Sequence, residues 1–168
     1  MFQRFYPKHY VESTYEIPFE ELYQKGFRGV LFDIDNTLVP HGAAADERAE
    51  NLFKRLHEIG FSSCLISNNK EERVNLFRKN IKVDAIYKAR KPRTEAYINA
   101  MKKIGTNTAN TVFVGDQLFT DIWGANRAGI ETYLVKPIHP KEEIQIVLKR
   151  YLEKIVLHRY TKEMKRKR

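Results

Sequence analysis

Two aspartates, one residue apart, stand where an apolar segment ends early in the chain. The segment 29–32 (Gly-Val-Leu-Phe) has the composition of a buried strand, and Asp33 and Asp35 follow it closely. Carboxylates at the end of a buried strand are costly to desolvate unless other groups pair with them. A capping role would need only one acid, so the pair indicates a site with chemistry of its own.

Phosphoryl transfer through a carboxylate is the chemistry that suits this pair. Asp33 suits the nucleophile, because an aspartate that attacks phosphorus forms an aspartyl-phosphate and divides one difficult displacement into two. Asp35 suits the general acid and base, which protonates the leaving alcohol and later deprotonates the attacking water. The nucleophile and the phosphate are both anions, so we expect a divalent cation to neutralise them.

Four short motifs occur in the order that characterises one family. They are Asp33-x-Asp35-x-Thr37, Ser67 after the predicted strand 61–66, Lys91 before Pro92, and Gly-Asp-x4-Asp with Asp116 and Asp121. The set resembles motifs I to IV of the haloacid dehalogenase (HAD) superfamily and covers residues from about 27 to 135. The second acid resembles the phosphatase branch, because the ion-pump branch has threonine there and the dehalogenases lack the acid. The resemblance therefore implies hydrolysis of a phosphomonoester.

The resemblance implies a magnesium site made of oxygen ligands. Asp33, Asp116 and Asp121 would hold Mg²⁺ together with the backbone carbonyl of Asp35. Mg²⁺ prefers hard oxygens and keeps several waters, so few protein ligands suffice. An alternative for Asp121 is an ordinary position in the first turn of a helix, where the helix dipole favours an acid.

The resemblance also implies a phosphate-binding set. Thr37, Ser67 and Asn68 would bind phosphate oxygens, and Lys91 would hold the charges of the nucleophile and the phosphate together. Ser67 could instead be an ordinary helix cap. We expect His41 on a surface loop, and the residues alone leave open whether Asn36, Asn68 or His41 touches the substrate.

Strands and helices alternate along the chain, which predicts an α/β fold. Strands are expected at 27–32, 61–66, 84–87, 111–114 and 131–135, and helices at 18–26, 43–59, 70–79, 91–105, 120–128 and about 140–158. Such a chain forms a mainly parallel sheet covered on both faces, with ligands at the carboxyl ends of its strands. The resemblance adds a three-layer, Rossmann-like arrangement of five strands in the order 5-4-1-2-3. Ser67 follows Asp33 by 34 residues and Lys91 follows Ser67 by 24, which leaves no room for a cap domain.

The composition suits one soluble domain in a reducing compartment. The chain has 168 residues, 42% of them hydrophobic and one of them cysteine, Cys64. We expect a domain over 1–158 with its core at 27–135 and an N-terminal arm at 1–17, followed by a disordered basic tail at 159–168. No apolar run reaches the roughly 20 residues that span a bilayer, and the first residues lack the apolar core of a secretory signal. These features predict a cytoplasmic location.

The net charge of +9 is concentrated at the end of the chain. Residues 149–168 hold nine Lys or Arg and two acids, so this segment carries +7 and the remainder +2. The mixture of apolar and basic residues suits an amphipathic helix on anionic lipid, which would make the protein peripheral at the inner membrane face. A core-packed final helix with a solvated tail fits the pattern equally.

The size and motif layout resemble the YqeG-like group of subfamily IIIA, which is related to mitochondrial phosphatidylglycerophosphate phosphatase. That resemblance implies a bulky substrate with a lipid headgroup phosphate, reached through an open site or one closed by the partner subunit of a homo-oligomer. Two other interpretations stay open. A nucleic-acid end phosphatase would also use a basic tail, and a non-catalytic scaffold would keep only the fold.

Overall fold

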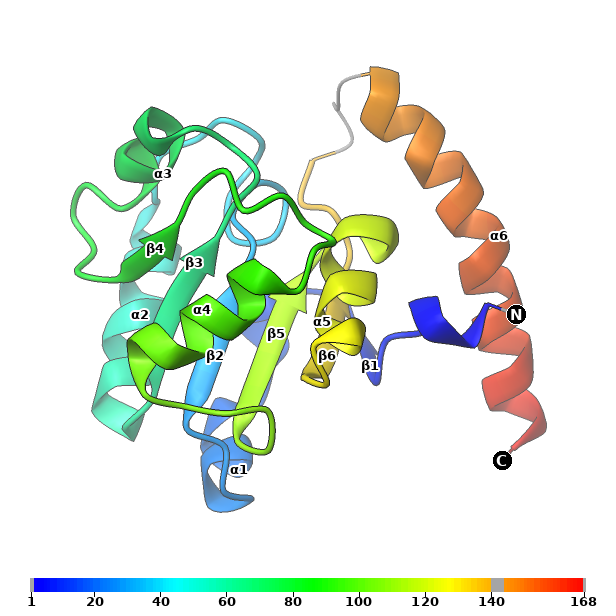
Figure 1. Cartoon of the computed structure of the whole chain (residues 1–168), viewed down its shortest axis with the longest axis horizontal. Coiled ribbons are helices and arrows are strands. Elements are labelled where there is room, and N and C mark those ends of the chain that lie inside the picture. Colours follow the sequence, from blue (N-terminus) through cyan, green and yellow to red (C-terminus); the bar gives the residue numbers. More distant parts are fainter. Residues whose placement is uncertain (1, 140–143, 168) are drawn as a thin grey trace.

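A six-stranded sheet lies at the centre of the structure, a computed structural model that describes residues 2–139 and 144–167. Its order is β1-β6-β5-β2-β3-β4, and every pairing is parallel (Figure 1). The strands are β1 (His9–Val11), β2 (Gly29–Phe32), β3 (Ser62–Ile66), β4 (Asp84–Ile86), β5 (Thr111–Gly115) and β6 (Glu131–Val135). Apart from β1, this is the predicted order, with the strand that precedes Asp33 at the centre.

Helices cover both faces of the sheet, as a parallel sheet requires. They are α1 (Phe19–Gln24), α2 (Glu47–Ile59), α3 (Glu71–Phe77), α4 (Glu95–Ile104), α5 (Trp123–Arg127) and α6 (Ile144–Arg166), with short helical turns η1 (Gln3–Phe5), η2 (Thr14–Glu16) and η3 (Leu118–Ile122). Val30 and Phe32 of β2 belong to a core cluster with α1 and α2, whereas Leu31 belongs to a second cluster with α4 and α5. The two-residue period of the strand sends alternate side chains to opposite faces. The predicted three-layer α/β fold is confirmed.

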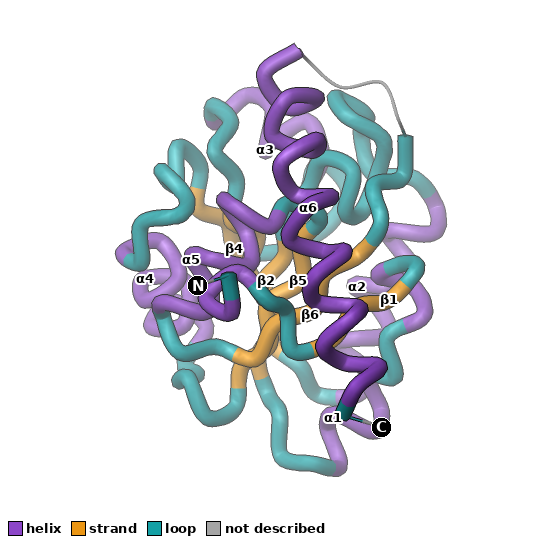
Figure 2. The backbone as a smooth tube through the Cα atoms, turned by 90° about the vertical axis from the view of Figure 1, so that its right-hand side faces the viewer, coloured by secondary structure: helices purple, strands orange, loops and turns teal. Residues whose placement is uncertain are grey.

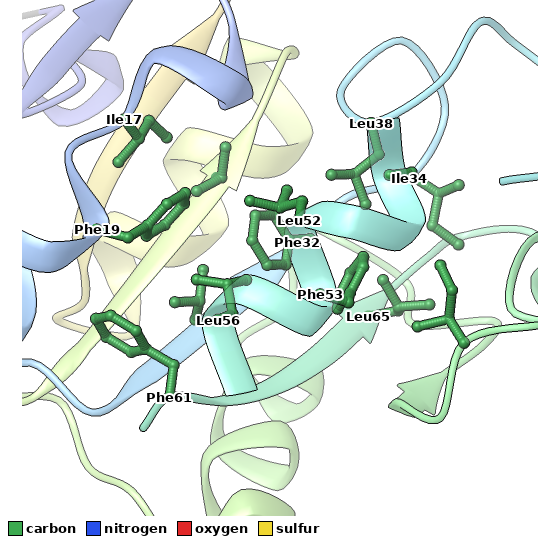
Figure 3. Close-up of a cluster of buried hydrophobic side chains, with 14 of the residues drawn as sticks. Ile17, Phe19, Phe32, Ile34, Leu38, Leu52, Phe53, Leu56, Phe61 and Leu65 are labelled. Atoms are coloured by element: carbon green, nitrogen blue, oxygen red, sulfur yellow. The ribbon is translucent and has the colours of Figure 1, made fainter. Parts of the chain in front are cut away.

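The core on the α2 side fixes the strand that leads into the site. Figure 3 shows Phe53 and Leu56 of α2 beside Phe32, and the ring centroids of Phe32 and Phe53 are 5.4 Å apart. The side chain of Asp46 caps the start of α2, and Gly60 ends the helix with a φ of +113°, which favours glycine. Apolar burial on this face therefore holds β2 in a fixed place.

The sixth strand, β1, lies within the segment 1–17 that was expected to be an arm. It pairs with β6 at the edge of the sheet, with Tyr10 opposite Leu134. The predicted count of five strands is therefore wrong, because the described sheet has a sixth strand at its edge. Three residues are too few to show the alternation by which a strand is recognised in a sequence.

Several helices differ in detail from their predicted ranges, and α2 begins at Glu47, not at 43. α4 begins at Glu95, not at 91, and the predicted helix at 120–128 is divided into η3 and α5. η3 is a π-helical turn that begins at Leu118, so Asp121 lies within it. π-helical turns are rare and often occur at functional sites.

α6 is longer than the predicted helix and lies at the β1 edge of the sheet (Figures 1 and 2). The helix continues to Arg166, so the expected disorder of 159–168 is wrong for most of that segment. The N-terminal arm supplies the reason, because the Tyr6 hydroxyl donates to Glu163 Oε1 at 3.0 Å and the Tyr6 ring contacts that of Tyr160. The start of the predicted helix, 140–143, lies outside the described residues. Within the described residues, no helix is both long and apolar enough to cross a membrane.

Candidate active site

The predicted site residues meet at the carboxyl ends of the parallel strands. Asp33 follows β2, Ser67 follows β3, Asp116 follows β5, and Lys91 lies beyond β4. All four of these residues are buried, with at most 8% of their surface exposed. Strand order, not closeness in sequence, brings them together, as predicted for an α/β sheet.

Three carboxylates form the centre of the site. Asp33, Asp116 and Asp121 each place an oxygen within 4.8 Å of the other two. Lys91 lies among them, with its Nζ 2.7 Å from Asp33 Oδ1 and 2.6 Å from Asp121 Oδ1. The oxygen donors of this cluster are of the kind that Mg²⁺ prefers, so these residues could hold that ion.

Burial and charge shift the pKa values of this cluster strongly. Burial, with the neighbouring Asp121, raises the pKa of Asp33 well above the ordinary range of a carboxyl, and Lys91 opposes that shift. Burial also raises the pKa of Asp116, to about 6. For Lys91, burial lowers the pKa, but the attraction of Asp121 and Asp33 outweighs it and leaves the pKa raised. Lys91 therefore stays charged and neutralises part of the acidic cluster.

Asp121 makes hydrogen bonds through both its side chain and its backbone, more than an ordinary acid in the first turn of a helix requires. Its Oδ2 accepts hydrogen bonds from the backbone N–H groups of Asp116 at 3.2 Å and Gln117 at 3.1 Å. The hydroxyl of Tyr97 lies 3.0 Å from the backbone carbonyl of Asp121 and the same distance from that of Thr120. These contacts fix the acid in place and leave its Oδ1 facing Lys91.

Thr37 and Asn68 contact the site residues themselves. The Thr37 Oγ1 lies 3.2 Å from Asp33 Oδ2 and 2.9 Å from Asp116 Oδ1, so its hydroxyl can donate to one of the two carboxylates at a time. Asn68 Oδ1 accepts from the Lys91 N–H at 2.7 Å, and Asn68 Nδ2 donates to the Lys91 carbonyl at 3.3 Å. Asn68 therefore positions the backbone of Lys91, while a direct contact of either residue with phosphate stays a prediction.

Ser67 is a buried residue at the turn after β3. Its Oγ accepts a hydrogen bond from the Asn69 N–H at 3.1 Å, and only 1% of its surface is exposed. This bond is the short-range contact of a capping serine. The predicted role in phosphate binding stays a prediction.

The side chain of Asp35 is not part of the three-acid cluster. Its Oδ1 accepts from the Gly42 N–H at 2.7 Å and from Arg73 Nη2 at 2.9 Å, and its Oδ2 accepts from Asn69 Nδ2 at 2.8 Å. His41, expected on a surface loop, is partly exposed and has its Nδ1 3.8 Å from Asp35 Oδ1. The role of the Asp35 backbone carbonyl at a metal stays a prediction.

Sequence reasoning missed two arginines that contact the predicted acids. Arg73 of α3 binds Asp35, and Arg150 of α6 binds both the carboxylate and the backbone carbonyl of Asp116. Glu153, one turn after Arg150, accepts from the Leu118 N–H at 2.8 Å and so attaches α6 to the loop after β5. The basic character of α6 was a signal for Arg150, whereas α3 holds one arginine and two glutamates, and no motif singles out either arginine.

The sequence of this chain is similar to those of known phosphatases and to one family model. The HAD-hydrolase-like family model matches residues 88–143. The probable phosphatase YqeG of Bacillus subtilis is 34% identical over 154 residues, which cover 91% of this chain and 90% of that protein. The phosphatidylglycerophosphate phosphatase 1 of Arabidopsis thaliana, named chloroplastic/mitochondrial, is 30% identical over 165 residues and covers 91% of this chain. This chain spans 47% of the plant protein.

A solved structure shows the same fold at low identity. The crystal structure of 3-deoxy-D-manno-octulosonate 8-phosphate phosphatase from Moraxella catarrhalis superimposes with a TM-score of 0.52 and 17% identity, over 71% of this chain and 75% of that one. The chain thus belongs to the HAD superfamily of hydrolases, as its 34% identity to YqeG over most of both proteins shows. Within that superfamily it is a YqeG-like phosphatase, as the motif layout predicted.

Proposed function

We propose that this phosphatase is Mg²⁺-dependent, that Asp33 is its nucleophile, and that phosphatidylglycerophosphate is its substrate. The observation that carries the proposal is the buried contact of Asp33 with Lys91, beside two further acids that lie within 4.8 Å. A carboxylate held among acids needs cations around it, and a phosphate would bring still more negative charge. The site is therefore suited to bind a dication and a phosphate together.

Oxygen ligands from Asp33, Asp116 and Asp121, with the backbone carbonyl of Asp35, would hold the Mg²⁺. The fit rests on chemistry, because the three described carboxylates are buried and all of their donors are hard oxygens. When bound, Mg²⁺ supplies the charge neutralisation that lets an anionic nucleophile approach an anionic phosphate. Magnesium is also present in the structure of the Moraxella enzyme with the similar fold.

The chemistry proceeds in two displacements. In the first, a carboxylate oxygen of Asp33 forms a bond to phosphorus, and the ester oxygen leaves with the bonding electron pair and takes a proton from Asp35. In the second, a water oxygen attacks the same phosphorus while the Asp35 carboxylate takes its proton. The bond between phosphorus and Asp33 breaks, and inorganic phosphate leaves. Asp35 must exchange its contact with Arg73 for one with the leaving oxygen.

The remaining residues hold charge and geometry during these steps. Lys91, already 2.7 Å from Asp33 Oδ1, would contact the transferred phosphoryl group and keep its charge balanced. Ser67, Thr37 and Asn68 would orient the phosphate oxygens or the residues that touch them. Preorganised donors of this kind act strongly in a buried site, because no solvent has to be rearranged.

The substrate assignment rests on similarity and on the shape of the chain. The plant phosphatidylglycerophosphate phosphatase is similar over 91% of this chain. Only α2 and β3 lie between the first two motifs, so no cap domain covers the site from that insertion point. An open site accepts a bulky substrate, such as a headgroup phosphate presented at a membrane surface, and we propose peripheral contact with anionic lipid.

Phosphate release from a panel of substrates tests this proposal. The panel holds p-nitrophenyl phosphate, phosphatidylglycerophosphate in mixed micelles, and 3′- and 5′-phosphorylated oligonucleotides, each with and without Mg²⁺. The full chain is compared with Asp33→Asn, which should lose all turnover and keep its thermal unfolding transition. Selective, Mg²⁺-dependent turnover of the lipid supports the proposal. Preference for an oligonucleotide would favour a nucleic-acid end phosphatase, and turnover by Asp33→Asn would refute the assigned nucleophile.

A further inference from the structure

We infer that the outward face of α6 is a docking surface for an anionic lipid bilayer. The α6 outer face consists of Val147, Leu148, Tyr151, Leu152 and Ile155. This inference deepens the proposed function, because it names the surface through which the enzyme reaches a phosphate on a membrane lipid. It can be tested separately from turnover.

The α6 outer face is a stripe of large apolar side chains that the described residues leave open. Leu148, Tyr151, Leu152 and Ile155 follow the spacing i, i+3, i+4, i+7, so they lie on one side of the helix. Their exposed fractions are 67%, 67%, 51% and 48%. A contiguous exposed apolar patch of this kind marks an interaction site more often than a chance surface.

The opposite side of α6 already has its partners within the chain. Val156 is buried against Leu118, Ile122 and Leu134, in a cluster beside the N-terminal arm. Glu153 is 4% exposed and accepts a hydrogen bond from the loop after β5. The packing of this inner side therefore determines which face of the helix points outward. Figure 2 shows α6 on the surface of the molecule.

The charges of α6 favour an anionic surface over an uncharged one. Its two acids, Glu153 and Glu163, are used inside the molecule by the Leu118 N–H and the Tyr6 hydroxyl. The basic side chains beyond Arg150 are exposed and extend along the helix, and they are Lys154, Arg159, Lys162, Lys165 and Arg166. Exposed apolar residues flanked by Lys and Arg, with the acids of the helix paired inside the molecule, favour contact with the interface of anionic lipid.

The α6 outer face also lies close to the candidate active site. Arg150, on the inner side of the same helical turn as Tyr151, contacts Asp116. An α-helix with its side chains is about 10 Å across. A bilayer against the α6 outer face would therefore approach the edge of the site, where a lipid headgroup could reach it.

Vesicle co-sedimentation of the full chain tests the apolar part of the inference. The vesicles contain equal parts of phosphatidylglycerol and phosphatidylcholine, without any phosphorylated substrate. Leu152→Gln combined with Ile155→Gln should weaken binding at least about tenfold, because two side chains lose their transfer into the apolar layer. The matched control is Ile98→Gln on α4, which also replaces a partly exposed isoleucine (40% exposed) and should leave binding unchanged.

Replacement of basic residues tests the electrostatic part. Lys154→Gln combined with Lys162→Gln should weaken binding and reduce its salt dependence, whereas Lys102→Gln combined with Lys103→Gln on α4 should do neither. Vesicles of phosphatidylcholine alone should bind weakly. Equal binding by all variants would overturn the inference. The inference would also be overturned if the chain associates with itself in the absence of lipid and the Leu152 and Ile155 replacements abolish that association. The α6 outer face would then be an interface with a second copy of the chain.

Turnover separates this inference from the proposed function. All four variants should hydrolyse p-nitrophenyl phosphate in the absence of lipid at the rate of the unchanged chain. If vesicles bind but phosphatidylglycerophosphate is not hydrolysed, the docking surface stands and the proposed substrate fails. If the lipid is hydrolysed in detergent micelles but vesicles do not bind, the substrate stands and the docking surface fails.

Discussion

The guanidinium of Arg150 binds both the carboxylate and the backbone carbonyl of Asp116, which joins α6 to the buried acids of the site. The other carboxylate oxygen of Asp116 lies 2.9 Å from the Thr37 hydroxyl. Both oxygens that could ligate a metal are therefore engaged, one of them by a cation. Arg150 and Lys91 together bring two positive charges to a cluster of three acids.

Arg150 should compete with the proposed Mg²⁺ for Asp116. We expect Arg150→Gln to lower the Mg²⁺ concentration for half-maximal turnover of p-nitrophenyl phosphate about 3- to 10-fold, which corresponds to ~1 kcal/mol. Mg²⁺ titration by phosphate release and by calorimetry would measure it. Lys149→Gln, on the same helix and exposed, is the control. A higher Mg²⁺ requirement would show that Arg150 orients Asp116 for the metal instead.

Lys91 should matter for both stability and turnover. In Lys91→Met, Asp33 and Asp121 lose a buried cation, so the metal-free protein should be about 3 kcal/mol less stable to unfolding. Turnover should fall about 100- to 1,000-fold, because a preorganised charge at the phosphate is lost. Thermal unfolding with and without Mg²⁺ is the measurement, and the ion should restore more stability to the variant than to the unchanged chain.

Lys88→Met serves as the control for Lys91. Lys88 belongs to the same short basic segment but is exposed, so its replacement should change neither the stability to unfolding nor the turnover. A loss of turnover in Lys88→Met as large as that in Lys91→Met would remove the reason for assigning the charge to position 91.

The sequence was enough to predict which residues gather at the candidate site, because position along an α/β chain determines position in space. Asp33, Ser67 and Asp116 each follow a strand, and parallel strands end at one edge of the sheet. The three acids whose carboxylates were predicted to hold the metal form the cluster, and the side chain of Asp35, for which only the backbone carbonyl was predicted as a ligand, lies outside it. The pairing of Asp35 with Arg73 could not be predicted, because a solvated arginine on a helix and an arginine that contacts the site have the same sequence pattern.

The docking of α6 was beyond sequence reasoning for a different reason. Apolar residues occur all round its first half, so periodicity could not decide between Val156 and Ile155 as the buried side. The structure buries Val156 and exposes Ile155. The contact that decides between them comes from η3 and the N-terminal arm, more than 20 residues away in sequence. Long-range packing of this kind leaves no local signal.

Gly115 should be required for the position of Asp121. A Cβ at residue 115 would lie 2.6 Å from Asp121 Cβ, which is closer than real Cβ atoms approach one another. We expect Gly115→Ala to displace Asp121, to lower turnover at least about 100-fold and to cost about 1–3 kcal/mol of unfolding free energy. Phosphate release and urea unfolding would measure the two effects.

Comparison with Tyr97→Phe shows whether the effect at Gly115 is local to the acid. That variant removes only the hydroxyl that contacts the carbonyls of Thr120 and Asp121, so turnover should fall less than in Gly115→Ala. If Gly115→Ala keeps full turnover, the close packing behind Asp121 is not needed for activity.

Cys64 should make the protein less stable at alkaline pH. Burial raises the pKa of its thiol to about 12, from an ordinary value near 9. Between these values the unfolded thiol loses its proton while the folded one keeps it, so the unfolded state binds fewer protons and stability falls as pH rises. One such proton adds a slope of about 1.4 kcal/mol per pH unit. Urea unfolding between pH 9 and 11 would measure the unfolding free energies of the full chain and of Cys64→Ala. The difference between these two free energies should become smaller as pH rises. Parallel curves, or rapid reaction of the native thiol with a thiol reagent at pH 8, would contradict the raised pKa.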